Sequence, residues 1–515
     1  MVTHSLFNFK QIFWTLSLFC YFFTTPVGAQ TCKEVIGYYP SWQWYDRNKL
    51  VQPSTIDYSQ YSIINYAFLY PKADGHLTLT DPWADKNLLL GDFNWATAPA
   101  GYDSGYDLGN PAYHQPNTSI VYHAHQNNTL VMLSIGGWTL SNDFPDIAAN
   151  PTKRTNFAHS CSETVRLYGI DGIDIDWEYP GYASHNGTPN DKANFTLLLK
   201  EVRDSLDVLE QALSKNLLLT AAFGAAPARM SDIEWQNVVP LLDYINLMSY
   251  DFFGAFSPET NHNAPLYAPA VGDSTFNIHS AIDRLTSTYN VPASKINIGI
   301  AFYGRSAKTT AAAGLHVPTT GTADNATFSL DDGSPLYYNI LKQQHLFTTH
   351  WDSQAEVPYL TGAGNLQTFV SYDDEQSIGL KGQYVVDNQL GGVIIWEITG
   401  DYIESPTGVI SGTPLADTLN KALCHSSTVL SNPSNATVAR PMIEIYPNPV
   451  EQHLQLETTI AATDAWVKIY NPLGIVVLEQ SLDQGNIDVQ HLAMGQYILT
   501  ISTNEQVYTK LFSKL

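Results

Sequence analysis

Eight short apolar segments recur between residues 34 and 398, and stretches of helical character separate them. They lie at 34–39, 62–70, 129–138, 169–177, 217–225, 244–252, 296–304 and 391–398. Several are apolar at successive positions, which is typical of parallel strands covered on both faces. Between two of them, residues 194–214 are apolar at helical spacing. This alternation predicts the α/β class and a (β/α)8 TIM barrel with insertions; an open, doubly wound sheet is the structural alternative.

Two connections in this pattern are too long to be simple loops. Residues 71–128 are rich in Gly, Tyr, Asn and Asp, and residues 306–370 contain aromatic and β-prone pieces. Connections of this length are usually functional, and we expect the second to form an inserted α+β subdomain. Both follow the carboxyl ends of predicted strands, the face on which barrel enzymes build their active sites.

The N-terminus has the pattern of a secretory signal peptide. Lys10 precedes an apolar run from about residue 12 to 23, and small residues at 27–29 suit a cleavage site, so residues 1–29 are assigned to the signal. A membrane anchor is the alternative, but it needs a longer apolar run. We therefore expect a secreted, extracellular protein with no membrane association after the signal is removed.

The composition changes after residue 424, which closes a predicted barrel domain of residues 30–424. Residues 425–440 are rich in Ser, Asn and Pro and are predicted to be a linker. Residues 441–515 alternate in strand fashion between turn residues. They predict a small, separate all-β domain of sandwich type.

The charge of the chain bears on its partners. Asp and Glu total 49 against 25 Lys and Arg, a formal net charge of −24. Nucleic acid is bound by clustered cations, so we expect no nucleic acid partner.

The most unusual segment is DGIDIDWE at 171–178, because four carboxylates are interleaved with apolar residues on a predicted strand. Alternate side chains of a strand share a face, so Asp174, Asp176 and Glu178 point one way and the apolar set points the other. In a barrel, the apolar set faces the helices and the acids face the interior, with Glu178 at the carboxyl-end rim. Asp171 is out of phase and nearer the start of the strand, as a structural acid would be.

Three stacked acids cannot all ionise without a cost in free energy, so they titrate as a coupled unit. Glu178 could then hold a proton near neutral pH and give it to a leaving oxygen. A Mg²⁺ or Ca²⁺ site is one alternative, because both ions prefer oxygen ligands. Acids bonded only to backbone or neighbouring hydroxyls are another. No Cys or His spacing suggests a metal, and we expect neither a metal nor a cofactor.

This segment fits the pattern DGxDxDxE and resembles the signature of glycoside hydrolase family 18, the chitinase family. The likeness extends from about Val35 to Leu423. Further similar segments are SIGGW at 134–138, LMSYDFFG at 247–254, NHNAPLY at 261–267, GIAFYGR at 299–305, FVSYDDEQSI at 369–378 and GGVIIWEITGD at 391–401.

The resemblance implies a role for each matching residue. Glu178 matches the general acid and later base, Asp176 the acid that orients the substrate acetamide, and Asp174 the acid that shares a proton with Asp176. Tyr250 matches the phenol that hydrogen-bonds the acetamide carbonyl. The residues that match sugar-binding positions are Tyr38, Phe68, Trp138, Met248, Asp251, Arg305 and Trp396, although core packing alone would explain Tyr38, Phe68 and Met248 equally well.

The activity implied by this resemblance is that of a secreted chitinase, which cuts β-1,4 linkages between N-acetylglucosamine units of chitin or its oligosaccharides. The mechanism implied is substrate-assisted and retaining, one of the exceptions to the usual carboxylate nucleophile. Two alternatives remain: an endo-β-N-acetylglucosaminidase acting on N-glycans, and a chitin-binding lectin on the same fold. Lectin relatives typically lose the acid that Glu178 supplies here.

The tail resembles the C-terminal sorting domain of the type IX secretion system of certain Gram-negative bacteria. The matching features are YPNP at 446–449, GQYILTIST at 495–503, and the late lysines Lys510 and Lys514. The resemblance implies the secretion machinery as a partner. A β-sandwich retained to bind polysaccharide is the alternative.

Three cysteines remain after the signal, Cys32, Cys161 and Cys424, which allow one bridge and one free thiol in an oxidising compartment. In the expected barrel, Cys32 lies just before the first strand, at the bottom. Cys424 follows the last helix, which descends to the same place, whereas Cys161 lies in a helix on another side. We therefore predict a Cys32–Cys424 disulfide.

Overall fold

The structure is a computed structural model that describes residues 31–97, 110–329, 333–425, 443–447, 449–458, 465–471, 476–482, 486–502 and 507–515. The chain forms two compact units, Met1–Thr428 and Val429–Leu515. The predicted signal peptide at 1–29 lies outside the described residues, as does the predicted linker at 425–440 apart from its first residue.

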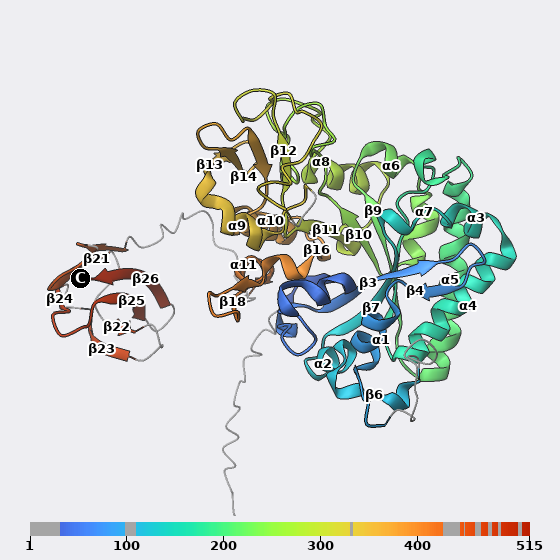
Figure 1. Cartoon of the computed structure of the whole chain (residues 1–515), viewed down its shortest axis with the longest axis horizontal. Coiled ribbons are helices and arrows are strands. Elements are labelled where there is room, and N and C mark those ends of the chain that lie inside the picture. Colours follow the sequence, from blue (N-terminus) through green and yellow to red (C-terminus); the bar gives the residue numbers. More distant parts are fainter. Residues whose placement is uncertain are drawn as a thin grey trace, which may run out of the picture. The chain divides into compact units, whose positions relative to one another are not determined.

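The first unit is built on a closed barrel of eight parallel strands (Figure 1). In chain order they are β2 (Glu34–Pro40), β3 (Ile63–Pro71), β7 (Leu130–Gly136), β8 (Gly172–Asp176), β9 (Leu218–Gly224), β10 (Tyr244–Met248), β11 (Ile296–Ala301) and β16 (Gly392–Trp396). Each pairs with the next, and β16 pairs with β2 to close the ring. Each of the eight predicted segments contains one strand, so the TIM barrel is confirmed and the open sheet is wrong.

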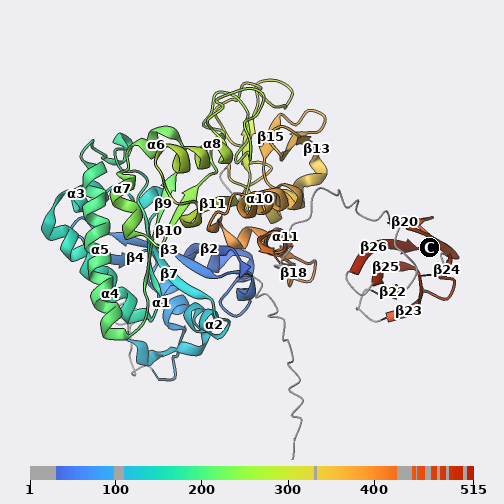
Figure 2. The same cartoon turned by 180° about the vertical axis from the view of Figure 1, so that it is seen from behind.

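Helices cover the outside of the barrel, as Figures 1 and 2 show from opposite sides. The longer ones are α4 (Pro151–Tyr168), α5 (Asp191–Leu213), α10 (Glu375–Asp387) and α11 (Pro414–Leu423), and the shorter ones include α1 (Pro82–Leu90), α2 (Ile120–Gln126), α3 (Phe144–Ala149), α6 (Pro227–Ser231), α7 (Trp235–Val238) and α8 (Ile278–Asp283). Helix α5 shows why they form: its buried residues Leu198, Val202, Leu206 and Leu209 recur every three or four positions and face the core.

The two long connections contain secondary structure of their own. The first holds β4 (Leu77–Leu79), which pairs with β3, helix α1, the short pair β5 (Asp92–Phe93) and β6 (His114–Gln115), and helix α2. The second connects β11 to α10. It contains helix α9 (Tyr337–Gln343) and an antiparallel sheet ordered β12 (Arg305–Lys308), β15 (Thr368–Ser371), β14 (Val357–Gly362), β13 (Phe347–Asp352).

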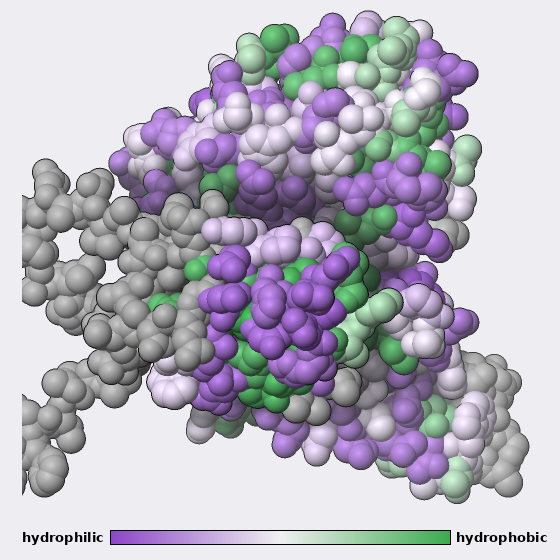
Figure 3. Space-filling view, turned by 90° about the vertical axis from the view of Figure 1, so that its left-hand side faces the viewer, coloured by the Kyte–Doolittle hydropathy of each residue, from purple (hydrophilic) through white to green (hydrophobic). Residues whose placement is uncertain are grey.

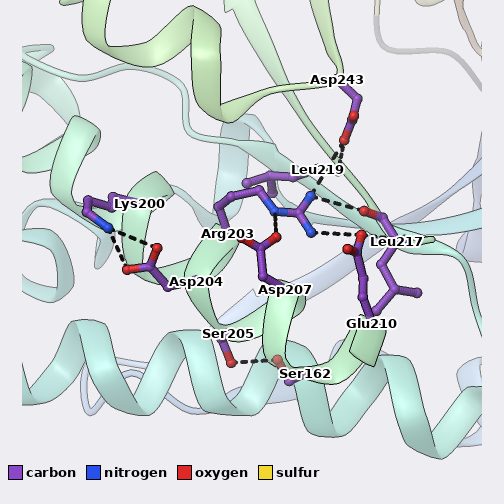
Figure 4. Close-up of polar contacts among 10 residues, drawn as sticks. All are labelled: Ser162, Lys200, Arg203, Asp204, Ser205, Asp207, Glu210, Leu217, Leu219 and Asp243. Atoms are coloured by element: carbon purple, nitrogen blue, oxygen red, sulfur yellow. Dashed lines mark hydrogen bonds and ion pairs between the residues drawn. The ribbon is translucent and has the colours of Figure 1, made fainter. Parts of the chain in front are cut away.

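The amino ends of the strands, opposite the site described below, are held by buried or half-buried ionic contacts. Figure 4 shows one around Arg203 of α5, which pairs with Glu210 (3.0 Å) and Asp243 (3.7 Å) and donates to the carbonyl of Leu217 (3.0 Å). Because Leu217 directly precedes β9, this network fixes the helix to the start of that strand. The side chain of Arg203 is 15% exposed, which lessens the screening by solvent.

Asp171 is part of the same end of the barrel. Its Oδ2 accepts from the backbone N–H of Val131 and lies 2.7 Å from Nε2 of His125, and its Oδ1 lies 2.7 Å from Nζ of Lys215. Burial opposes the charge of Asp171, but the hydrogen bonds from His125 and Lys215 outweigh it and lower the pKa of this carboxyl. Asp171 therefore joins three elements at the base of the barrel, the structural position expected from its phase in the strand.

A disulfide joins the two ends of the barrel unit. The short strands β1 (Thr31–Cys32) and β19 (Cys424–His425) are antiparallel neighbours, and Cys32 lies opposite Cys424. A disulfide joins these two cysteines, which are 392 positions apart in the sequence. Cys161 is a free, buried thiol in α4. The bridge is the one predicted from the positions of the three cysteines in the barrel.

The second unit is all-β. One sheet is ordered β20 (Ile443–Tyr446), β21 (His453–Thr458), β24 (Asn486–Asp488), and the other β23 (Val476–Ser481), β22 (Trp466–Tyr470), β25 (Gly495–Ser502), β26 (Val507–Lys514). Buried residues of both sheets, among them Leu454, Val467 and Leu499, form one core of their own. The unit is thus the small β domain expected from the sequence.

The surface carries no single dominant apolar area on the face drawn in Figure 3, where hydrophilic residues prevail between smaller hydrophobic patches. Within the described parts of the chain, no helix combines the length and apolar character needed to cross a membrane.

We predict that the disulfide stabilises the barrel by restricting the unfolded chain. Cys32→Ala and Cys424→Ala should each lower the free energy of unfolding by about 2–4 kcal/mol, as loss of a bridge across a long loop typically does. The double variant should lose little more than either single one, because all three lack the same bond. Urea unfolding of the four proteins measures this, and additive losses would contradict it.

Candidate active site

The acids of β8 alternate with apolar residues as the sequence predicts. Ile173, Ile175 and Trp177 are buried in the core between strands and helices. Asp174 and Asp176 point into the barrel, and Glu178 follows two residues after the strand ends. One side of a single strand thus carries three carboxyls toward the carboxyl-end face.

Asp174 is the lowest of the three and is completely buried. Its Oδ2 accepts hydrogen bonds from the hydroxyls of Tyr38 (2.8 Å) and Ser134 (2.7 Å). Its Oδ1 accepts from the hydroxyl of Thr220 (2.6 Å) and the amide of Asn246 (3.1 Å). Burial raises the pKa of Asp174, but these four donors act in the opposite direction and stabilise the charged form.

Asp176, the middle acid, has a different environment. It is 4% exposed, and its Oδ1 has no hydrogen-bond partner within the described residues. Burial, with the negative charges of Glu178 and Asp174, raises its pKa well above the usual range. Of the two lower acids, Asp176 is therefore the one whose protonated form is favoured more strongly, and it lines the cavity while its Oδ1 is buried and unpaired.

Glu178 lies highest, at the rim. Burial, with a smaller contribution from the charge of Asp251, raises its pKa to about 7, and a hydrogen bond from Tyr179 acts in the opposite direction. A large share of Glu178 is therefore protonated near neutral pH. A carboxyl in this state can donate a proton to one group and later accept one from another.

The strand β10 and the residues after it supply the facing wall. Met248 ends the strand, and Tyr250 follows with a pKa raised well above its usual value by burial, so its phenol remains a hydrogen-bond donor. Asp251 is held by Arg305, whose Nε lies 2.7 Å from Oδ1, and by the hydroxyl of Tyr303 at 2.5 Å. The ion pair and the hydrogen bond fix the orientation of Asp251.

These groups line one cavity of about 940 Å³. Its floor is aromatic: Phe68 stacks on Trp396 with ring centroids 5.6 Å apart, and Tyr38 lies 5.7 Å from the same indole. Trp138 and Trp42 stand at the edges with about half of each side chain exposed. Flat apolar rings beside polar groups suit the binding of sugar rings.

Every site residue predicted from the sequence lines this cavity except Asp174, which lies below it and is bonded to Tyr38. The further lining residues, which sequence reasoning missed, are Trp42, Thr80, Thr139, Leu140, Tyr179, Tyr182, Ala222 and Phe256. Several come directly after barrel strands, and the rule that such loops build the site could have identified Trp42 and Tyr179.

The surroundings of Asp174, below the cavity, bear on the metal alternative. Three hydroxyls and an amide donate hydrogen bonds to both of its oxygens. Across the described residues, no group of three or more His, Cys, Asp or Glu side chains is arranged to hold a metal ion.

A parallel barrel with a carboxyl of raised pKa at its rim, beside an aromatic cleft, is an arrangement that suits a glycoside hydrolase. Residues 34–401 match the family model described as glycosyl hydrolases family 18. The chain belongs to this family. Residues 444–514 match the model of the secretion system C-terminal sorting domain, so the chain carries a signal for secretion.

Known relatives agree with this assignment. Chitinase A1 of Niallia circulans is 34% identical over an alignment of 405 residues that covers 72% of this chain but only 56% of that protein. Endochitinase 1 of Metarhizium robertsii is 34% identical over 389 residues, 73% of this chain and 85% of that protein. Among solved structures, chitinase ChiA74 from Bacillus thuringiensis has 28% identity and a TM-score of 0.65, covering 94% of this chain and 85% of its own.

We predict that Glu178→Gln makes the folded protein more stable at high pH than the wild type. An unfolded glutamate loses its proton near pH 4.3, whereas folded Glu178 keeps it until about pH 7, so the wild type loses stability across that window. Glutamine has no carboxyl to ionise, so the variant does not lose this stability. The variant should gain up to about 3 kcal/mol relative to wild type between pH 4 and 8.

Chemical unfolding at a series of pH values measures this difference. Glu259 is exposed, so Glu259→Gln is the matched control and should shift stability little at any pH. A difference between Glu178→Gln and wild type that is constant from pH 4 to 8 would contradict the prediction.

Proposed function

We propose that the chain is a secreted chitinase that hydrolyses β-1,4 linkages between N-acetylglucosamine units of chitin and its oligosaccharides. Family membership, the names of its relatives and the aromatic cavity support this. The single observation that carries it is the pairing of Glu178, with a pKa of about 7, with a buried Asp176 whose Oδ1 is unpaired. The first suits proton donation, and the second offers a partner to a substrate amide.

The proposed reaction begins when Glu178 protonates the oxygen of the glycosidic bond. The carbonyl oxygen of the substrate acetamide attacks the anomeric carbon, the bond to the leaving sugar breaks, and a cyclic oxazolinium forms. Asp176 accepts a hydrogen bond from the acetamide N–H, and Tyr250 donates one to its carbonyl oxygen. Water then attacks the anomeric carbon and gives a proton to Glu178. The bond between that carbon and the acetamide oxygen breaks, which restores the acetamide, and the configuration is retained overall.

Asp174 and Asp176 have different proposed roles because their hydrogen-bond surroundings differ. Four donors oppose the protonation of Asp174, whereas Oδ1 of Asp176 has no such bond, so we place the proton shared by the lower pair on Asp176 before the reaction begins. As positive charge develops on the oxazolinium, Asp176 can pass that proton toward Asp174 and become the anion beside it. A charge that appears where it is needed stabilises the transition state more than the ground state.

The remaining predicted residues hold the sugar. Trp396 would lie under the ring that is cleaved, with Tyr38, Phe68 and Met248 beside it, and Trp138 would stack on a neighbouring sugar. Arg305 fixes Asp251, whose carboxylate would face the acetamide side of the site. Holding the acetamide oxygen near the anomeric carbon supplies an effective molarity worth up to ~7–11 kcal/mol in well-oriented systems.

The domain plan follows from the same proposal. Residues 1–29 would direct entry to secretion, residues 30–424 form the catalytic barrel with its insertion at about 306–370, residues 425–440 link it to the tail, and residues 441–515 form the sorting domain. The secretion machinery is the proposed partner of that tail. We propose no nucleic acid or membrane partner and no cofactor.

We predict that cleavage requires an N-acetyl group on the sugar that contributes the anomeric carbon. A glucosamine there offers an amine, which cannot form the oxazolinium ring, and a glucose offers a hydroxyl. Chitin oligosaccharides should be cut and cello-oligosaccharides left intact. On partly deacetylated chitosan, mass spectrometry should find N-acetylglucosamine at every new reducing end.

Glu178→Gln is the control, since it should bind chitin oligosaccharides without cutting them. Frequent glucosamine at new reducing ends would show that the acetamide is not the nucleophile. Rapid cleavage of N-glycans with slow cleavage of chitin would favour the endo-β-N-acetylglucosaminidase alternative. Binding without cleavage by the wild type would favour the lectin.

We predict that the exported protein lacks roughly its last 75 residues, because a sorting signal is commonly removed at export. Intact mass of the protein from the culture supernatant of its native host measures this. A full-length secreted form would instead favour a C-terminal domain retained to bind polysaccharide.

A further inference from the structure

The backbone of Glu178 lies beyond the hydrogen-bond ladder of the barrel. Strand β8 ends at Asp176, whose last paired neighbour in β7 is Gly136, and its pairing with β9 ends one residue earlier. The N–H and C=O of Glu178 therefore have no partner in the sheet. Backbone groups at a half-buried position need partners, and without them the residue would be free to shift.

Two side chains from different loops satisfy these groups. The hydroxyl of Ser141, which is fully buried, accepts from the N–H of Glu178 at 2.8 Å and donates to the carbonyl of Gly137 at 2.9 Å. Nδ1 of His185 lies 2.7 Å from the carbonyl oxygen of Glu178. Because a carbonyl only accepts, Nδ1 of His185 carries the proton.

The loop that carries His185 has a fixed shape of its own. The backbone N–H groups of Gly181 and Thr188 both donate to Oδ2 of Asp191, at 3.1 and 2.8 Å, which closes the loop onto the start of α5. The ring of His185 also packs against Trp138, with centroids 4.5 Å apart. One imidazole therefore contacts both the backbone of the rim acid and an aromatic wall of the cleft.

We propose that Ser141 and His185 are positioning residues that clamp Glu178 from both sides of its backbone, and that His185 also sets the ring of Trp138. This rests on the proposed function of Glu178 as the acid. A carboxyl misplaced by about 1 Å can lose about 100-fold in rate. Glu178 would therefore be a poor catalyst if its backbone were free to shift. His185 contributes a hydrogen-bond donor to Glu178 and a ring to Trp138, and two substitutions can test these contributions independently.

His185→Phe keeps a ring against Trp138 but removes the donor. His185→Asn removes the ring but places an amide N–H where Nδ1 stood. With chitin oligosaccharides, His185→Phe should lower kcat about 10- to 100-fold and leave KM within about twofold. His185→Asn should keep kcat within about threefold and raise KM, because Trp138 loses its support. Ser141→Ala should lower kcat in the same way as His185→Phe.

His159 is exposed on α4, so His159→Phe is the matched control and should behave as wild type. Thermal melting of each variant sets a common assay temperature at which all are folded. Wild-type kcat in both His185→Phe and Ser141→Ala would overturn the clamp, as would equal losses of kcat in His185→Phe and His185→Asn. An inactive wild type would instead show that the proposed function is wrong, which distinguishes the two failures.

Discussion

The four hydrogen bonds received by Asp174 couple the closure of the barrel to its chemistry. Their donors come from β2, β7, β9 and β10, so one carboxylate in the interior gathers side chains from four other strands. A buried charge is tolerated only when it is hydrogen-bonded in this way. The same bonds oppose the effect of burial on the pKa of Asp174, and the negative charge of Asp174 is one reason why the pKa of Asp176 above it is raised.

The other two acids of the site follow Asp174 along the same strand, toward the rim of the barrel. Asp174 has four hydrogen-bond donors, whereas Asp176 above it has an oxygen with no partner in the described structure. Glu178 then reaches the rim, where burial raises its pKa to about 7. One segment of eight residues thus presents three carboxyls whose pKa values are all raised by burial, but to different extents, because each has different donors and charges around it.

The sequence made the barrel and its acid strand predictable because both depend on short-range periodicity. Apolar runs gave the eight strands, and the two-residue alternation placed Asp174, Asp176 and Glu178 on one face. Phe256 was not predicted, because it lies on a loop whose path depends on packing elsewhere in the fold. Nor could spacing reveal His185 or Ser141: each reaches Glu178 through a loop conformation, and a lone His or Ser in a sequence carries no sign of a partner.

The bond between Cys32 and Cys424 has a mechanical consequence. It makes the barrel a covalently closed ring, with both chain ends leaving from one point. A pull on the segment after residue 424 is therefore borne by that bond, and β2 does not have to resist being sheared away from β16. Cutting the chain beyond residue 425 therefore leaves the ring whole.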